Sequence, residues 1–337
     1  MQAIPFGRRA LARRFAIAAG GIAALLLGLG ASPLASAQQA WPAKPVRLVV
    51  PFPAGAAPDV IARLVADRLA RSWGQSVFIE NRPGAGAIPG MSALARSSND
   101  GYTIGFVPAA AATLTPLLYK NPQFNIDADL APVALVGTSP MMVAVNATSS
   151  VNSMADLVRE AQARPGKLNF AAAQANSVPH LTGELLSRAG HLQLFTVPYS
   201  GSPTATNAVL AGDAQLAVDG LPALVQHVKG GKLRAIAVTS PRRLPGFDNV
   251  PAVAETLSGF ESVGWFMLFV PAGTPAAIVE QINRDTNAAL QQPELVAQLA
   301  DLGVYPSPGA PAAAAEFLRQ QREKGRAVVR DLNLQQQ

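Results

Sequence analysis

The sequence contains no cysteine, so no disulfide can form and no thiolate can hold a metal. The same absence excludes a lipid-modified N-terminal cysteine. Aromatic residues make up only 6 % of the chain and charged residues 14 %, whereas apolar residues make up 49 %. Stability must therefore come from a large apolar core.

The motifs of metal-dependent and covalent catalysis are also missing. No HExxH, CxxC or cluster of Asp and Glu is present, and the Ser200-Gly201-Ser202 segment lacks the pattern of a G-x-S-x-G nucleophile elbow. Gly84-x-Gly86 begins like a dinucleotide fingerprint, but Pro89 stands at the third glycine position. The three histidines are scattered: His180, His191 and His227. We expect no metal, no cofactor and no enzymatic activity. An exported hydrolase with a Ser/His/Asp set assembled from distant residues is the remaining enzymatic alternative.

Basic charge is concentrated at the N-terminus. The formal net charge is +6, from 27 basic and 21 acidic residues, and no acidic residue precedes Asp59. Without residues 1–37, the chain has 23 basic and 21 acidic residues, which is a net charge of +2. The basic residues removed are Arg8, Arg9, Arg13 and Arg14. The remaining charge gives no support to nucleic-acid binding.

Residues 1–37 have the three parts of an export signal. The arginines are followed by an apolar run, Phe15–Ala31, and then by the small residues Ala35-Ser36-Ala37. This order predicts a signal peptide that is cleaved after Ala37, so we expect the mature chain to be exported. The run is short for a membrane span and contains several glycines, so an uncleaved anchor is the weaker alternative. Phe15 lies one place too close to its arginine pair for a twin-arginine signal, which favours the general secretory route.

Short apolar runs alternate with helical patterns along the mature chain. This alternation predicts an α/β fold of parallel sheets covered by helices, with loops of small residues at the carboxyl edge, where such folds bind ligands. A longer apolar stretch, Leu130–Asn146, is expected to break at Gly137-Thr138-Ser139-Pro140. The other expected strands are Val46–Val50, Ser76–Glu80, Tyr102–Val107, Lys167–Ala171, Leu192–Val197, Gln215–Val218, Leu233–Val238 and Gly264–Val270.

The first strand leads into a site that is suited to anions. After Val46–Val50 come small residues and then an amphipathic helix, with Pro58 in its first turn and Asp59 near its positive end. Small side chains let a ligand approach the backbone N–H groups of a helix N-terminus, which attract negative charge. The same pattern is also typical of an ordinary βα unit, and this alternative stays open at this point.

Several motifs at these loops carry a family resemblance. They are WPAKPVRLVVPFPAG from Trp41 to Gly55 with Asp59, Ala62 and Arg63, ENRPGAG from Glu80 to Gly86, DGYT from Asp100 to Thr103, VPYSGS from Val197 to Ser202, and PAGTP from Pro271 to Pro275. Each motif alone is weak, but the combination is specific. Over essentially the whole mature chain, the sequence resembles the Bug family of extracytoplasmic solute receptors, which serve tripartite tricarboxylate transporters.

The resemblance implies a type II periplasmic-binding-protein fold, in which two lobes are joined by two crossing strands and a ligand is trapped between them. The crossings are expected near Val136–Val143 and Val263–Val270. Lobe 1 is then 38–140 plus 263–337, and lobe 2 is 141–262. The implied function is capture of a small organic carboxylate in the periplasm for the membrane permease subunits of a tripartite transporter. Because a closing cleft needs free lobes, we expect a monomer. The alternative binding function is a ligand sensor presented to a membrane sensor kinase.

Carried over by motif, the resemblance implies that loops of both lobes hold the ligand. The implied residues are Phe52, Ala54, Gly55, Ala56 and Asp59 on one side and Ser177, Tyr199, Ser200 and Asp219 on the other. For Asp59, capping of the helix is an alternative role.

The chain also departs from the family pattern by losing polar groups. Ala, Val and Pro replace the usual Gly and hydroxyl residues in two loops, and Ser200 replaces a frequent Lys. In these two loops the replacing residues are Ala56, Ala57, Pro58, Ala172, Ala173, Val178 and Pro179. We therefore expect a ligand less polar than a tricarboxylate, such as an aromatic or longer aliphatic carboxylate.

Overall fold

The computed structural model describes residues 2, 41–173, 177–332 and 334–336. The chain divides into two compact units, residues 1–41 and 42–337, and the fold below is that of the second. The expected signal peptide and its cleavage site after Ala37 lie outside the described residues. Among the helices that are described, none combines the length and apolar character that a membrane crossing needs.

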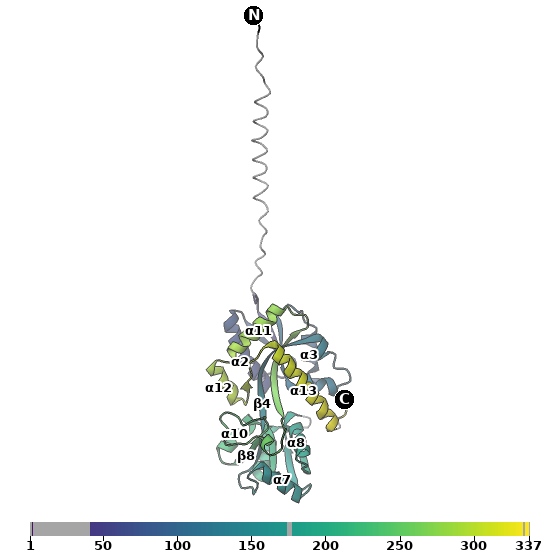
Figure 1. The fold of residues 1–337 in the computed structure, drawn as a ribbon, viewed down its shortest axis with the longest axis vertical. Helices are drawn as coiled ribbons and strands as arrows, with labels where there is room; N and C mark the ends of the chain where they lie inside the picture. Colours follow the sequence, from purple (N-terminus) through teal and green to yellow (C-terminus); the bar gives the residue numbers. More distant parts are fainter. Residues whose placement is uncertain (1, 3–40, 174–176, 333, 337) are drawn as a thin grey trace. The chain divides into compact units, whose positions relative to one another are not determined.

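Strands of the second unit form one mixed sheet (Figure 1). Their order is β2-β1-β3-β9-β4-β7-β5-β6, and β8 and β10 each pair with β4. The strands are β1 (Val46–Val50), β2 (Val77–Asn81), β3 (Thr103–Pro108), β4 (Leu130–Asn146), β5 (Leu168–Ala172), β6 (Leu194–Pro198), β7 (Leu216–Gly220), β8 (Leu233–Val238), β9 (Val263–Pro271) and β10 (Tyr305–Pro306).

Strand β4 is continuous, so the expected break at residues 137–140 is wrong. Its first part, Leu130–Pro140, pairs with β9, and its second part pairs with β7 and β8. Pro140 stands where β4 changes partner, so its missing N–H costs little there. Gly137 is required by close packing, because a Cβ atom at this position would lie 2.6 Å from the carbonyl oxygen of Tyr305 in β10.

We call the side of the sheet with β1, β2 and β3 its first half and the side with β5, β6 and β7 its second half. Strands run parallel within each of these sets and antiparallel at the centre, so the expectation of parallel sheets is only partly right. β1 runs parallel to β2 and β3, and β5 runs parallel to β6 and β7. β9 runs antiparallel to β3 and β4, and β7 runs antiparallel to β4. The carboxyl ends of β1 and β3 therefore point toward the second half of the sheet, and those of β5, β6 and β7 point back toward the first.

Helices follow most strands, in the order expected from the sequence. Ser153 caps α7 by accepting the Asp156 N–H at 3.1 Å. Helices α11 and α13 both pack against β4 (Figure 1). The helices are α2 (Ala57–Trp73), α3 (Ile88–Ala95), α4 (Ala109–Thr113), α5 (Thr115–Leu118), α6 (Ile126–Asp129), α7 (Met154–Ala163), α8 (Val178–Ala189), α9 (Ser202–Ala211), α10 (Leu221–Lys229), α11 (Ala276–Ala289), α12 (Pro293–Asp301) and α13 (Pro311–Asp331).

Each half of the sheet has its own apolar core. In the first half, Met267 and Phe269 of β9 pack with Leu318 of α13. In the second half, Val143 of β4 packs with Phe170 of β5 and their neighbours. Separate cores on the two sides of the central strand give the fold its two-lobed organisation.

Candidate functional site

The loop between β1 and α2 is held in place by the buried side chain of Asp59. Its carboxylate is 2 % exposed and accepts hydrogen bonds from the Gly55 N–H at 2.8 Å, Arg63 Nε at 3.0 Å and Asn81 Nδ2 at 2.9 Å. Asn81, at the end of β2, also donates to the carbonyl oxygen of Phe52 at 3.1 Å. Asp59 and Asn81 therefore form a clamp that fixes the loop from both ends.

The charge of Asp59 is retained inside this clamp. Burial by itself acts to raise the pKa of Asp59, but the hydrogen bonds from Arg63, Gly55 and Asn81 outweigh it and lower the pKa below its usual value. Ala56, the N-cap residue of the helix that follows, forms no capping hydrogen bond through its side chain. Asp59 thus bonds to the loop rather than capping α2, and in this structure its oxygens are occupied by protein groups.

The clamp leaves backbone donors of the loop available. Ala54, Gly55 and Ala57 are exposed, and Gly55 has φ = 80°, a conformation that favours glycine. Within the described part of the chain, the N–H groups of Ala54 and Ala57 have no hydrogen-bond partner. Exposed N–H groups at the start of a 17-residue helix can bind a small anion.

Three of the predicted residues in the second half follow β5 and β6. Ser177 is the N-cap of α8 and accepts the His180 N–H at 3.3 Å. Tyr199 is half-buried against the core, and its N–H donates to the carbonyl oxygen of Ala172 at 2.9 Å. Ser200 is exposed, with its hydroxyl 3.2 Å from that of Thr204. Residues 174–176 of the predicted loop 172–179 lie outside the described residues.

Asp219, near the end of β7, has an unsatisfied oxygen. The residue is 5 % exposed, and its Oδ1 accepts the Gly220 N–H at 2.7 Å. Its Oδ2 is buried and has no hydrogen-bond partner among the described residues. Burial raises the pKa of Asp219, and the hydrogen bond from the Gly220 N–H offsets this only in part. A buried carboxyl oxygen without a partner is costly, which makes Asp219 a candidate to contact a ligand.

The structure thus places every predicted binding residue at the carboxyl end of a strand. Phe52 to Asp59 follow β1, and the others follow β5 and β6 or end β7. The strands that carry these two sets have their carboxyl ends directed toward one another. Among the described residues, no hydrogen bond or ion pair joins the two sets. No group of three or more His, Cys, Asp or Glu among those residues is placed to hold a metal ion.

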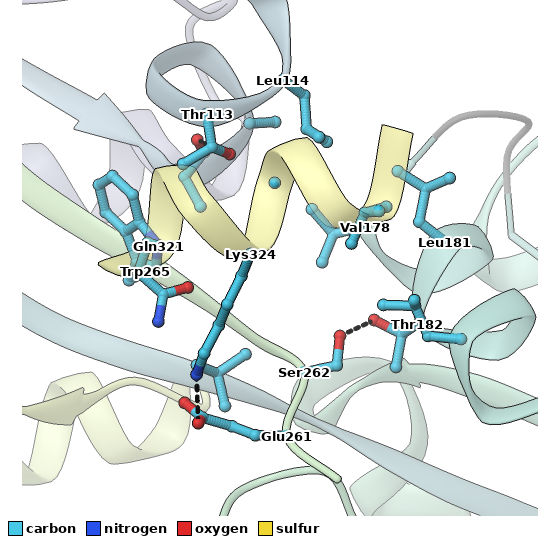
Figure 2. A pocket seen from close by; sticks show the side chains of 16 residues that line it. Thr113, Leu114, Val178, Leu181, Thr182, Glu261, Ser262, Trp265, Gln321 and Lys324 are labelled. Carbon is cyan, nitrogen blue, oxygen red and sulfur yellow. Dashed lines mark hydrogen bonds and ion pairs between the residues drawn. The ribbon is translucent and has the colours of Figure 1, made fainter. Parts of the chain in front are cut away.

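A cavity of about 100 Å³, which the sequence did not indicate, lies between the two halves (Figure 2). Lys324 pairs with Glu261 at 2.5 Å on one side of it, and the hydroxyls of Thr182 and Ser262 lie 2.7 Å apart on another. Its walls come from α4, α8, α13 and the segment that enters β9. The residues of α8 and α13 that line the cavity are spaced by three and four positions. Every packed helix shows this spacing, so it could not have identified the cavity from the sequence.

Comparison with known proteins identifies the family. The model of the tripartite tricarboxylate transporter family receptor, TctC, matches residues 61–334. BugT of Bordetella pertussis is 34 % identical over 293 residues, which cover 86 % of this chain and 90 % of BugT.

Solved structures agree with this match. The Rhodopseudomonas palustris protein Rpa4515, solved with adipate, superposes with a TM-score of 0.74 at 30 % identity, covering 88 % of this chain and 100 % of that one. MatC of Rhodopseudomonas palustris, with bound malate, gives 0.69 at 28 % identity, covering 86 % and 100 %. The resemblance to the Bug receptors and the expected fold are thereby confirmed. The chain belongs to the TctC family of tripartite tricarboxylate transporter receptors and is a periplasmic solute-binding protein of the Bug type.

Proposed function

We propose that this receptor captures a small organic carboxylate in the periplasm and delivers it to the membrane permease subunits of a tripartite tricarboxylate transporter. Two observations on relatives support the ligand class: one homologous structure was solved with adipate and another with malate. The family match supports the permease partner. In this chain, the observation that carries the proposal is the Asp59 clamp, which presents exposed backbone N–H groups at the carboxyl edge of β1.

The lobes that trap the ligand would be 38–140 plus 263–337 and 141–262. The change of partner in β4 between Pro140 and Met141 supports the first crossing. The second crossing would enter β9 at Val263, where Ser262 still donates its N–H to the carbonyl oxygen of Thr239. Rotation about these two points would bring the opposed strand edges together around the ligand. Such closure suits a monomer with free lobes.

The ligand carboxylate would bind the loop of Phe52, Ala54, Gly55 and Ala56 on one side. Ser177, Tyr199 and Ser200 would supply hydroxyl groups from the other, and the free oxygen of Asp219 would accept a ligand hydroxyl or an ordered water. Asp59 would act through the loop rather than on the ligand. Reversible binding needs no further chemistry, so we propose no catalytic step.

The N-terminal segment would be the export signal, removed after Ala37. The periplasmic character of the family and the charge pattern of residues 1–37 support this assignment.

A thermal-shift screen of the mature chain, residues 38–337, tests the proposal. The panel comprises mono-, di- and tricarboxylates, aliphatic and aromatic, with matched uncharged amides as controls. A ligand at about 100 times its Kd stabilises the folded state by about 2.7 kcal/mol, which raises the unfolding midpoint visibly. Stabilisation by carboxylates and not by their amides is the expected result. A folded, ligand-free chain that responds to no carboxylate would contradict the proposal.

A further inference from the structure

Residues on one side of each of three helical segments line the cavity between the halves. Three helical segments contribute residues spaced by one, three or four positions (Figure 2). They are Val178, Leu181, Thr182 and Leu185 of α8, Gln321, Lys324, Gly325 and Val328 of α13, and Ala109, Ala110, Thr113 and Leu114 at α4. Trp265 of β9 also lines the cavity and is 1 % exposed. The cavity is therefore enclosed by helices that come from both halves of the sheet.

Much of the polar lining of this cavity is already satisfied within the protein. The Thr113 hydroxyl donates to the carbonyl oxygen of Ala109 at 2.8 Å. Thr182 bonds to Ser262, and Lys324 pairs with Glu261. Lys324 and Glu261 are partly exposed to solvent. Of the rest of the wall, Gln321 is polar and the other residues are alanine, leucine, valine, glycine and tryptophan. A cavity with this lining favours a hydrocarbon group over water.

The cavity begins beside the proposed carboxylate site. Val178 directly follows Ser177, and Ala109 directly follows Pro108, the last residue of β3. The cavity therefore starts at the carboxyl end of β3 and the first turn of α8, and it extends along α8 away from Ser177. A ligand held by its carboxylate near Ser177 would have its other end directed to this space.

We propose that this cavity is a subsite for the hydrocarbon end of the carboxylate ligand. The ligand would then be an aliphatic carboxylate with a short apolar tail, rather than a compact tricarboxylate. A volume of about 100 Å³ equals the space of roughly three water molecules, so it holds a tail of a few carbon atoms. This inference rests on the proposed function, because it needs a carboxylate to be bound first.

A homologous series tests the subsite. Straight-chain monocarboxylates from acetate to octanoate are titrated into the full chain by calorimetry. Each buried methylene contributes about 0.8 kcal/mol, so affinity should rise about fourfold per carbon and stop rising once the cavity is full. Two substitutions should move that limit in opposite directions. Ala110→Leu fills the cavity and should remove the gain beyond the shortest acids, whereas Leu114→Ala enlarges it and should shift the limit to longer acids.

Ala277→Leu is the matched control, because Ala277 is exposed on α11, away from the cavity. It should leave the whole series unchanged. Carboxylate binding that shows no dependence on chain length, or a limit that neither cavity variant moves, would overturn the subsite while leaving the receptor function intact. If Ala110→Leu does not fold, Leu114→Ala alone decides the question. Failure of every carboxylate to bind the unchanged chain would instead overturn the proposed function, and the subsite with it.

Discussion

Replacing Asp59 with alanine tests the clamp that shapes the β1–α2 loop. The change removes the acceptor of three donors, from Gly55, Arg63 and Asn81, and leaves the half-buried Asn81 amide with one partner fewer. Hydrogen bonds to a charged acceptor contribute about 1.5–3 kcal/mol each when buried. The side chain of Arg63 is 54 % exposed, so its contribution is reduced by solvent to well under 1 kcal/mol. The expected loss of unfolding free energy is about 3 kcal/mol.

Urea denaturation at neutral pH measures this loss, with Asp301→Ala as the control. Asp301 is an exposed residue at the end of α12, and its replacement should change stability by less than about 0.5 kcal/mol. Affinity for carboxylates should also fall in Asp59→Ala, because the loop is no longer fixed before binding.

The pH dependence of Asp59→Ala has a definite sign. The folded-state pKa of Asp59 lies below its ordinary value of 3.8, so its contribution is complete above that value and is lost as the pH falls through the folded pKa. The difference between the unchanged chain and Asp59→Ala should therefore shrink in acid. A variant as stable as the unchanged chain at pH 7, or a difference that persists below the folded pKa, would refute the clamp.

Three further substitutions test other parts of the account. Burial raises the pKa of Asp219, so its ionised form destabilises the fold above pH 3.8. Asp219→Asn should therefore stabilise the ligand-free chain by about 1 kcal/mol at pH 7 and not in acid. Thermal melts at pH 7 and in acid check this. Gly183→Ala places a Cβ atom 2.1 Å from the buried ring of Phe170, and should cost about 1–3 kcal/mol in urea denaturation. Ser177→Ala with Tyr199→Phe removes two proposed ligand donors, each contributing about 1 kcal/mol, so the carboxylate Kd should rise roughly 30-fold by calorimetry; an unchanged Kd would count against the site.

The sequence predicts local elements well because their causes are local. Pro58 in the first turn of α2 and Ser153 as the cap of α7 act within one turn of the chain. Residues 137–140 show the limit of this reasoning. They have the composition of a turn, but they form a strand because β10 packs on Gly137 and because Pro140 stands at the change of partner. Both causes come from residues distant in the sequence.

In the candidate site, too, features with local causes could be predicted and contacts between distant residues could not. The loops could be predicted, because each one follows an apolar run and carries family motifs. The partners of Asp59 could not, because Asn81 reaches it across the β1–β2 pair and has no local relation to it. The cavity was missed for a related reason: helices α4, α8 and α13 come from distant parts of the sequence, and only the packed fold brings them together.

Isothermal titration of the full mature chain with adipate, malate and hexanoate tests the central claim most directly. The account predicts saturable binding of at least one of these carboxylates, with one ligand per chain and a Kd that the Ser177→Ala, Tyr199→Phe double variant weakens. Absence of binding heat for all three, in a chain shown to be folded and free of retained ligand, would contradict the claim that this receptor captures carboxylates.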